Sequence, residues 1–153
     1  MLPKNILVPV DLGEGSEDAV AYAAELAHAL GATLHLLHVV GIPAMGVPEM
    51  GVAYSATMLD GMMSDDLHAL EHMLAPHQHM CTCGTPMIKS GDAREAINEA
   101  AKQLHIDLIV MATHGRHGIS RVLLGSVAES VVRTAPCPVL TVKQHPVTIE
   151  KAA

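Results

Sequence analysis

The 153-residue sequence has no Trp, no Phe and only two Tyr, so it offers no set of aromatic rings on which nucleic-acid bases could stack. Lys and Arg number 9 against 16 Asp and Glu, which gives a formal net charge of −7. A chain of this charge has no basic surface to neutralise a run of phosphates. We therefore expect no nucleic-acid partner.

Long apolar runs are also missing, because no stretch approaches the roughly 18 residues that would span a bilayer. The first residues, Met1 to Asn5, lead directly into a strand-like segment without the layout of a signal peptide. The three cysteines are an odd number, which argues against a secreted, disulfide-stabilised scaffold. We expect no membrane association and a cytoplasmic, reducing location.

Half of the residues are apolar, enough for one core in a chain of this length. We expect a single domain over residues 1–144 and a frayed C-terminal tail over residues 145–153.

Short apolar runs alternate with stretches of helical period. The predicted strands are Asn5–Val10, Thr33–Val40, a segment within Met80–Lys89 that Pro86 assigns to an edge, Asp107–Thr113 and Pro138–Lys143. The predicted helices run from a Ser16 cap to Gly31, from Met58 to about Ala75, from a capping box at Asp92 and Glu95 onward, and over Ser126–Ala135.

This alternation predicts an α/β fold, a doubly wound five-stranded parallel sheet with helices on both faces. In such sheets, ligands bind beyond the carboxyl ends of the strands, where the strand order reverses. The loops to consider are Asp11–Gly15, the stretch after Val40, and His114–Gly125.

The segment Met111–Val127 carries glycines before and at the start of a predicted helix. Gly125-Ser126 suits a phosphate, because the unpaired amides of a helix N-terminus attract anions and a glycine permits close approach. Alternatively, Ser126 with Glu129 is only a capping box. Spacing leaves both interpretations open, and the chain contains neither GxxxxGK[ST] nor GxGxxG.

Three segments carry a resemblance to a known family: NILVPVDLGEGSEDAVAYAAELA, LHLLHVV, and GDAREAINEAAKQLHIDLIVMATHGRHGISRVLLGSVAESVVRTAPCPVL. Over almost its whole length the chain resembles the universal stress protein family, in its single-domain, ATP-binding type. The resemblance implies a Rossmann-like fold, similar to that of the adenine nucleotide alpha hydrolases. ATP-binding members have a glycine, two residues, a second glycine, nine residues, then Gly-Ser or Gly-Thr. Here Gly115 matches the second glycine and Gly125-Ser126 the final pair, whereas Ala112 replaces the first glycine.

The resemblance implies a site for ATP, with or without Mg²⁺. Pro9, Val10 and Asp11 would line the ribose and adenine, Val39 would meet adenine through its backbone, and Met111 and Val127 would complete the pocket. Asp11 suits a ribose hydroxyl, but it is also a common turn or cap residue. Arg116 either reaches the outer phosphates or is a solvated surface charge.

The resemblance also implies a homodimer through the last strand, Pro138–Lys143, and at most weak ATP hydrolysis. We expect a nucleotide-binding stress-response switch or adaptor with no catalytic residue. The alternatives are a dimeric adaptor whose phosphate loop is closed to nucleotide, and a weak ATP hydrolase.

One further cluster of residues has side chains that suit zinc or copper. It comprises His68, His72, His77, His79, Cys81 and Cys83. The spacings are not those of zinc fingers, and the segment equally fits exposed surface. No metal ligand is assigned.

Overall fold

The computed structural model describes residues 2–41, 56–113 and 124–143. Strands and helices alternate along the chain, as predicted. The strands are β1 (Asn5–Val10), β2 (Thr33–Val40), β3 (Thr82–Cys83), β4 (Met87–Ser90), β5 (Leu108–Ala112) and β6 (Val139–Val142). The helices are α1 (Glu14–Leu30), α2 (Ala56–Leu74), a 3₁₀ turn η1 (Ala75–His77), α3 (Ala93–Gln103) and α4 (Ser126–Thr134).

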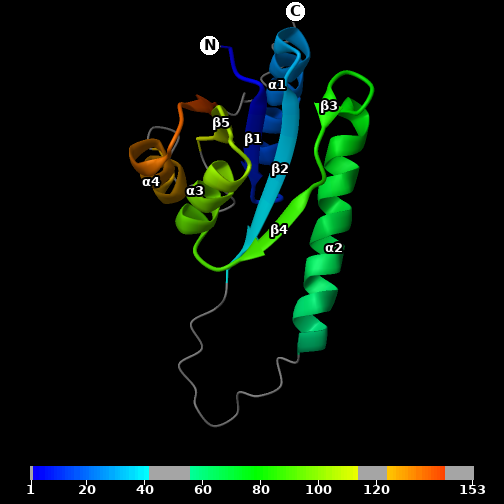
Figure 1. The fold of residues 1–153 in the computed structure, drawn as a ribbon. Helices are drawn as coiled ribbons and strands as arrows, with labels where there is room; N and C mark the ends of the chain where they lie inside the picture. The colour runs from blue at the N-terminus through cyan, green and yellow to red at the C-terminus, as the bar shows by residue number, and fades with distance from the viewer. Residues whose placement is uncertain (1, 42–55, 114–123, 144–153) are drawn as a thin grey trace, which may run out of the picture.

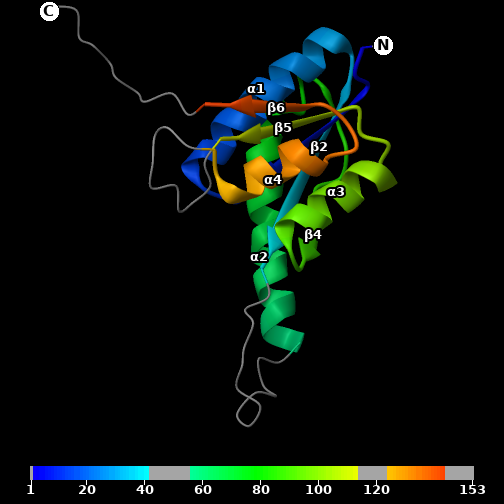
Figure 2. The same cartoon turned by 90° about the vertical axis from the view of Figure 1, so that its left-hand side faces the viewer.

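The strands form one parallel sheet with the order β3-β2-β1-β5-β6, and β4 also pairs with β2. Figure 1 shows β1 and β2 in the middle of the molecule, and Figure 2 shows β5 and β6 nearest the viewer, in front of β2. The predicted doubly wound parallel sheet is confirmed.

The two faces of the sheet are covered by different helices (Figure 2). Side chains at alternate strand positions, such as Ile6 and Val8, pack with α1 and α2 in one core cluster. The intervening positions, such as Leu7 and Ile109, pack with α3 and α4 in a second cluster. Both faces are therefore buried, as near-continuous apolar strands require.

The third predicted strand is interrupted. Thr82 pairs with Thr33 and Met87 pairs with Leu37, so β3 and β4 both lie on the side of β2 away from β1. Pro86, between them, has no amide hydrogen to donate to a ladder, which explains the break. The predicted edge position is confirmed, whereas the single strand is replaced by two short ones.

The cap prediction for the first helix is wrong. Gly13, not Ser16, is the N-cap of α1, and Ser16 lies inside the first turn. The end of the helix is as predicted, because Gly31 adopts a left-handed conformation with φ of 63°. At α3, Asp92 is the N-cap and accepts hydrogen bonds from the amides of Arg94 and Glu95.

No helix in the described part of the chain combines the length and the apolar character needed to cross a membrane. The predicted tail, residues 145–153, lies outside the described residues.

Candidate functional site

The strand order reverses between β1 and β5. From β1 the chain continues to β2 on one side, and it later returns to β5 on the other side. Leu7 pairs with Ile109, and the same register continued along the strands places Val10 beside Ala112. The turn at Asp11 and the segment after Ala112 therefore leave adjacent strands at the same edge of the sheet.

Asp11 is held in a tight turn. Its Oδ1 accepts hydrogen bonds from the Gly13 amide at 3.0 Å and from the Ser16 hydroxyl at 2.7 Å. The Asp11 amide donates to Ser16 Oγ at 3.1 Å, and Leu12 takes a left-handed φ of 61°. The turn role foreseen as an alternative for Asp11 is thus present, and it fixes the carboxylate at the end of β1.

Ser16 is the residue of this turn that sequence analysis assigned wrongly. Only 3% of its surface is exposed, and its hydroxyl both donates to and accepts from Asp11. A serine five residues after an aspartate at a strand end is the only signal in the sequence, and it is shared with ordinary caps.

The start of α4 lies next to the end of β5. The Gly125 amide donates to the Thr113 carbonyl at 2.8 Å, which joins the two ends of the segment 114–124. Gly125 occupies the N-cap position, and its carbonyl accepts the first helical bond from the Glu129 amide at 2.8 Å. Ser126 is therefore the exposed first residue of the helix, not the cap that the capping-box alternative requires. The amides of the first turn of a helix have no partner within the helix, so the start of α4 offers hydrogen-bond donors next to the end of β5.

Ala112, in place of a family glycine, keeps an extended backbone as the last residue of β5. Leu12 and His105 are the non-glycine residues with positive φ among those described. Ala112 packs, half-buried, against the core cluster that contains Val10. A Cβ at this position therefore demands no strained backbone.

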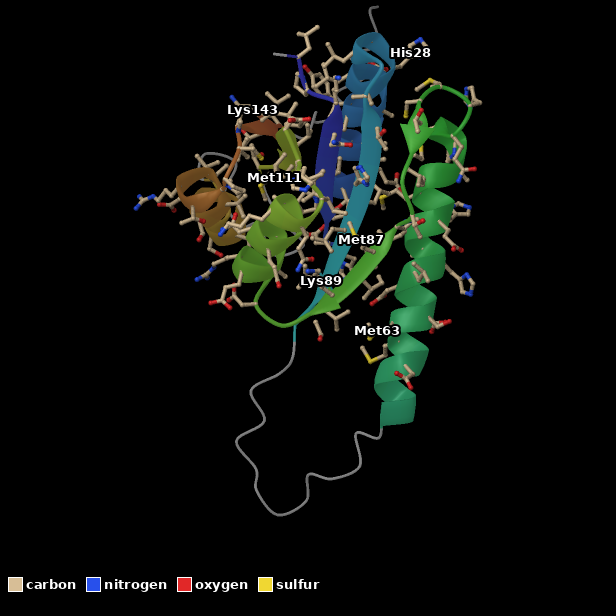
Figure 3. The ribbon with its side chains drawn as sticks, in the orientation of Figure 1. His28, Met63, Met87, Lys89, Met111 and Lys143 are labelled. Atoms are coloured by element: carbon tan, nitrogen blue, oxygen red, sulfur yellow. The ribbon has the colours of Figure 1, made fainter. Side chains whose placement is uncertain are left out.

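The remaining predicted residues are divided between the two faces. Met111 is buried under α3 and α4, and Figure 3 labels it on that side of β5. Val39 and Val127 pack, half-buried, against the same cluster, and Pro9 pairs with Leu37 in the neighbouring strand.

Val10, in contrast, has its side chain buried in the cluster beneath α1 and α2. Its side chain thus lies on the opposite face from Met111, although both residues lie near the same edge. Gly115 and Arg116 lie outside the described residues.

His38 is a further residue near this edge that sequence analysis did not identify. Its Nδ1 lies 2.8 Å from the Val10 carbonyl oxygen, and because a carbonyl only accepts, Nδ1 carries the proton. Its Nε2 lies 3.6 Å from Asp66 Oδ2 on α2. The imidazole joins β1, β2 and α2 immediately before the Asp11 turn. A histidine inside the apolar run TLHLLHVV was the available signal.

The histidine and cysteine cluster is not assembled as a metal site. Within the described ranges, no group of three or more His, Cys, Asp or Glu side chains is placed to hold a metal ion. His68 is exposed and contacts Glu71 on its own helix at 3.3 Å, whereas Cys81 contacts Cys83.

Comparison with known proteins gives a consistent result. The universal stress protein family matches residues 3–143. The chain is 33% identical over 140 residues to a universal stress protein A homologue of Coxiella burnetii, covering 91% of this chain and 95% of the relative. It is 34% identical to a universal stress protein of Methanocaldococcus jannaschii, covering 94% and 84% of the two chains. The solved universal stress protein UspA from Lactobacillus plantarum is 31% identical with a TM-score of 0.75, covering 91% and 97%.

Two solved universal stress proteins of the same fold hold adenine nucleotides. One is in complex with cAMP and is 22% identical, with a TM-score of 0.67. The other, from Arabidopsis thaliana, has AMP bound and is 24% identical, with a TM-score of 0.64. For this chain, likeness at those identities supports the fold alone. The matches over nearly the whole length establish that the chain belongs to the universal stress protein family.

Proposed function

We propose that this chain binds an adenine nucleotide, ATP with or without Mg²⁺, at the edge where β1 and β5 diverge. The observation that carries the proposal is the hydrogen bond from the Gly125 amide to the Thr113 carbonyl, at 2.8 Å, beside β1, which Asp11 follows directly. It brings a helix N-terminus and a fixed carboxylate to the same edge of the sheet. Helix N-termini favour phosphates, and carboxylates favour ribose hydroxyls.

The conformation of Gly125 indicates why a glycine stands at this position. It does not require the conformational freedom of glycine, and it is consistent with close approach of a phosphate. Its φ of −61° and ψ of 152° are open to any residue. A glycine at such a position is explained when a ligand approaches the backbone closely. Ala112 replaces the first family glycine in an extended strand, where a Cβ requires no strained backbone.

In this proposal the nucleotide acts as a signal. Its occupancy would change how the protein assembles or which partners it meets in the cytosol, as a switch or adaptor. Assembly would be a homodimer through β6, which lies at one end of the strand order and carries β-branched residues suited to edge pairing. Catalysis is not part of the proposal.

The test is nucleotide content followed by calorimetry. Nucleotide released from the purified protein is identified by mass, and ATP is then titrated into the nucleotide-free protein and its Gly125→Val variant. We expect binding weaker by at least about tenfold in the variant, which corresponds to about 1.4 kcal/mol. Gly61→Ala, on the exposed side of α2 where an added Cβ meets nothing within 4 Å, is the control. Nucleotide-free protein that gives no heat with ATP would leave the non-binding adaptor.

Asp11 offers a second, sharper comparison. Asp11→Asn keeps an oxygen for Ser16 and Gly13 but removes the charge, whereas Asp11→Ala removes both. We expect Asp11→Asn to retain most of the stability while binding ATP about tenfold more weakly, because hydrogen bonds to charged groups are the stronger ones. Equal ATP affinity in the wild type and Asp11→Asn would limit Asp11 to its turn.

A further inference from the structure

Two thiols lie together at the far end of the sheet from the proposed nucleotide site. Cys81 Sγ and Cys83 Sγ are 3.8 Å apart, and both side chains are half-buried free thiols. They flank Thr82 at the start of β3, which pairs with the amino end of β2 at Thr33.

Both cysteines border an open cavity. An open cavity of about 950 Å³ is lined by the end of α2 and the connection to β4, including Glu71, Leu74, Gln78, His79, Cys81 and Cys83. The two cysteines therefore share one solvent-connected wall.

Hydrogen bonds on both sides hold the two cysteines close together. The Cys81 amide donates to the His77 carbonyl at 3.3 Å, and the Gly84 amide donates to the Leu34 carbonyl at 2.8 Å. On the preceding residue, the Met80 carbonyl lies 2.6 Å from His28 Nδ1, and Figure 3 shows His28 at the end of α1 beside this connection. These hydrogen bonds hold the backbone on both sides of the pair and so keep the two residues together.

The distance between the two sulfurs suits a reversible disulfide. A disulfide needs the sulfurs about 2.05 Å apart, so they must approach by about 1.8 Å from 3.8 Å. Forming the bond therefore requires rotation about χ1 and a movement of the two-residue β3. A disulfide across a single intervening residue is strained, and strained disulfides are the readily reduced ones.

The surroundings of Cys83 favour its protonated form. Burial and the neighbouring Cys81 raise the pKa of Cys83 to about 11. Because the thiolate is the nucleophile, Cys83 is a poor first attacker, and the first step is assigned to Cys81.

We propose that Cys81 and Cys83 are a redox site, a dithiol that hydroperoxides oxidise to a reversible intramolecular disulfide. The Cys81 thiolate attacks one peroxide oxygen, so that an S–O bond forms, the O–O bond breaks and, for hydrogen peroxide, water leaves after protonation. The Cys83 sulfur then attacks the Cys81 sulfenic acid, the S–S bond forms, and the S–O bond breaks. The proton of Cys83 leaves with the hydroxyl as a second water. Two thiols thus lose two electrons in total, and one peroxide becomes two waters.

Counting thiols tests the proposal. The folded, reduced protein is treated with a small excess of hydrogen peroxide, alkylated with N-ethylmaleimide and weighed intact. Since the chain has three cysteines, we expect three adducts before oxidation and 3 − 2 = 1 afterwards. Dithiothreitol added before alkylation should restore all three.

Two variants identify the pair. Cys137, which packs with the α3 and α4 cluster, is the matched control, and Cys137→Ser should give two adducts before peroxide and none after it. Cys83→Ser should form no internal disulfide and should accumulate a Cys81 sulfenic acid that dimedone traps. Circular dichroism verifies that each variant is folded.

Three adducts after peroxide in the wild type would overturn the proposal. So would disulfide-linked dimers in place of the internal bond, or loss of two thiols in Cys83→Ser at the wild-type rate.

Discussion

Replacing Ser16 by alanine should loosen the turn that fixes Asp11 and destabilise the whole domain. The variant loses two hydrogen bonds, one to a carboxylate at 2.7 Å and one from a backbone amide at 3.1 Å. A hydrogen bond to a charged group contributes about 1.5–3 kcal/mol, and one between neutral groups about 0.5–1.5 kcal/mol. Because Asp11 is half-buried, water recovers part of this loss, and Gly13 still donates to Oδ1. We expect a loss of about 2 kcal/mol.

Thermal unfolding with a double-mutant cycle measures this loss. For a domain of this size, about 2 kcal/mol lowers Tm by about 4–8 °C. If the loss comes from the contact with Asp11, then Ser16→Ala should cost about 1–2 kcal/mol less in an Asp11→Ala background. Ser64→Ala, at an exposed position of α2, is the matched control and should change stability by less than about 0.5 kcal/mol.

The result that would refute this reasoning is additivity. Equal costs of Ser16→Ala with and without Asp11, or a cost as small as that of Ser64→Ala, would mean that the two hydrogen bonds do not hold the turn.

Substitutions at Gly84, Asp92 and Asp107 test separate parts of the fold. Gly84→Ala should lower the free energy of unfolding by about 1–3 kcal/mol, because the added Cβ would collide with the His35 ring. Gly61→Ala should raise it by about 0.5–1 kcal/mol. Equal urea midpoints for the two variants would contradict the packing at Gly84. Asp92→Ala should cost about 1 kcal/mol and Asp92→Asn little, since Asn is an equally good cap, and chemical denaturation compares the two. Two backbone amides lower the pKa of the Asp107 carboxyl, so its contribution is present above about pH 4 and is lost as pH falls through the lowered value. Asp107→Asn should therefore be less stable than the wild type at neutral pH, and the gap should narrow in acid; a gap that stays constant from pH 7 to pH 3 would contradict this.

The fold could be predicted from the sequence because its elements have strong periodic patterns. The run NILVPV is apolar after Asn5 and LIVMA is apolar at every position, which indicates strands buried on both faces, and both strands are observed. The sequence predicted only the edge position of the third strand and not its division into β3 and β4. Pro86 indicated an edge, but whether the chain rejoins the same neighbour after a proline depends on β2, which local sequence does not describe.

The sequence predicted which strand ends come together at the candidate site, but it did not predict the hydrogen-bond partners of the side chains there. Adjacent parallel strands bring the Asp11 and Ala112 ends together whatever the side chains are. The partners of Ser16 and His38 depend on rotamers and on which carbonyl lies nearby, and hydroxyls and imidazoles have many local options. The same ambiguity made Ser16 resemble a cap.

The break between β3 and β4 affects how copies of the protein could associate through the edges of their sheets. Among the described residues, that border of the sheet consists of two pieces of two and four residues, separated by Gly84, Thr85 and Pro86, whereas β6 presents an unbroken run. In the proposed homodimer, a second copy would extend the sheet along the β6 border. Two copies that met there about a twofold axis would each use up that border, so the proposed association would stop at a pair.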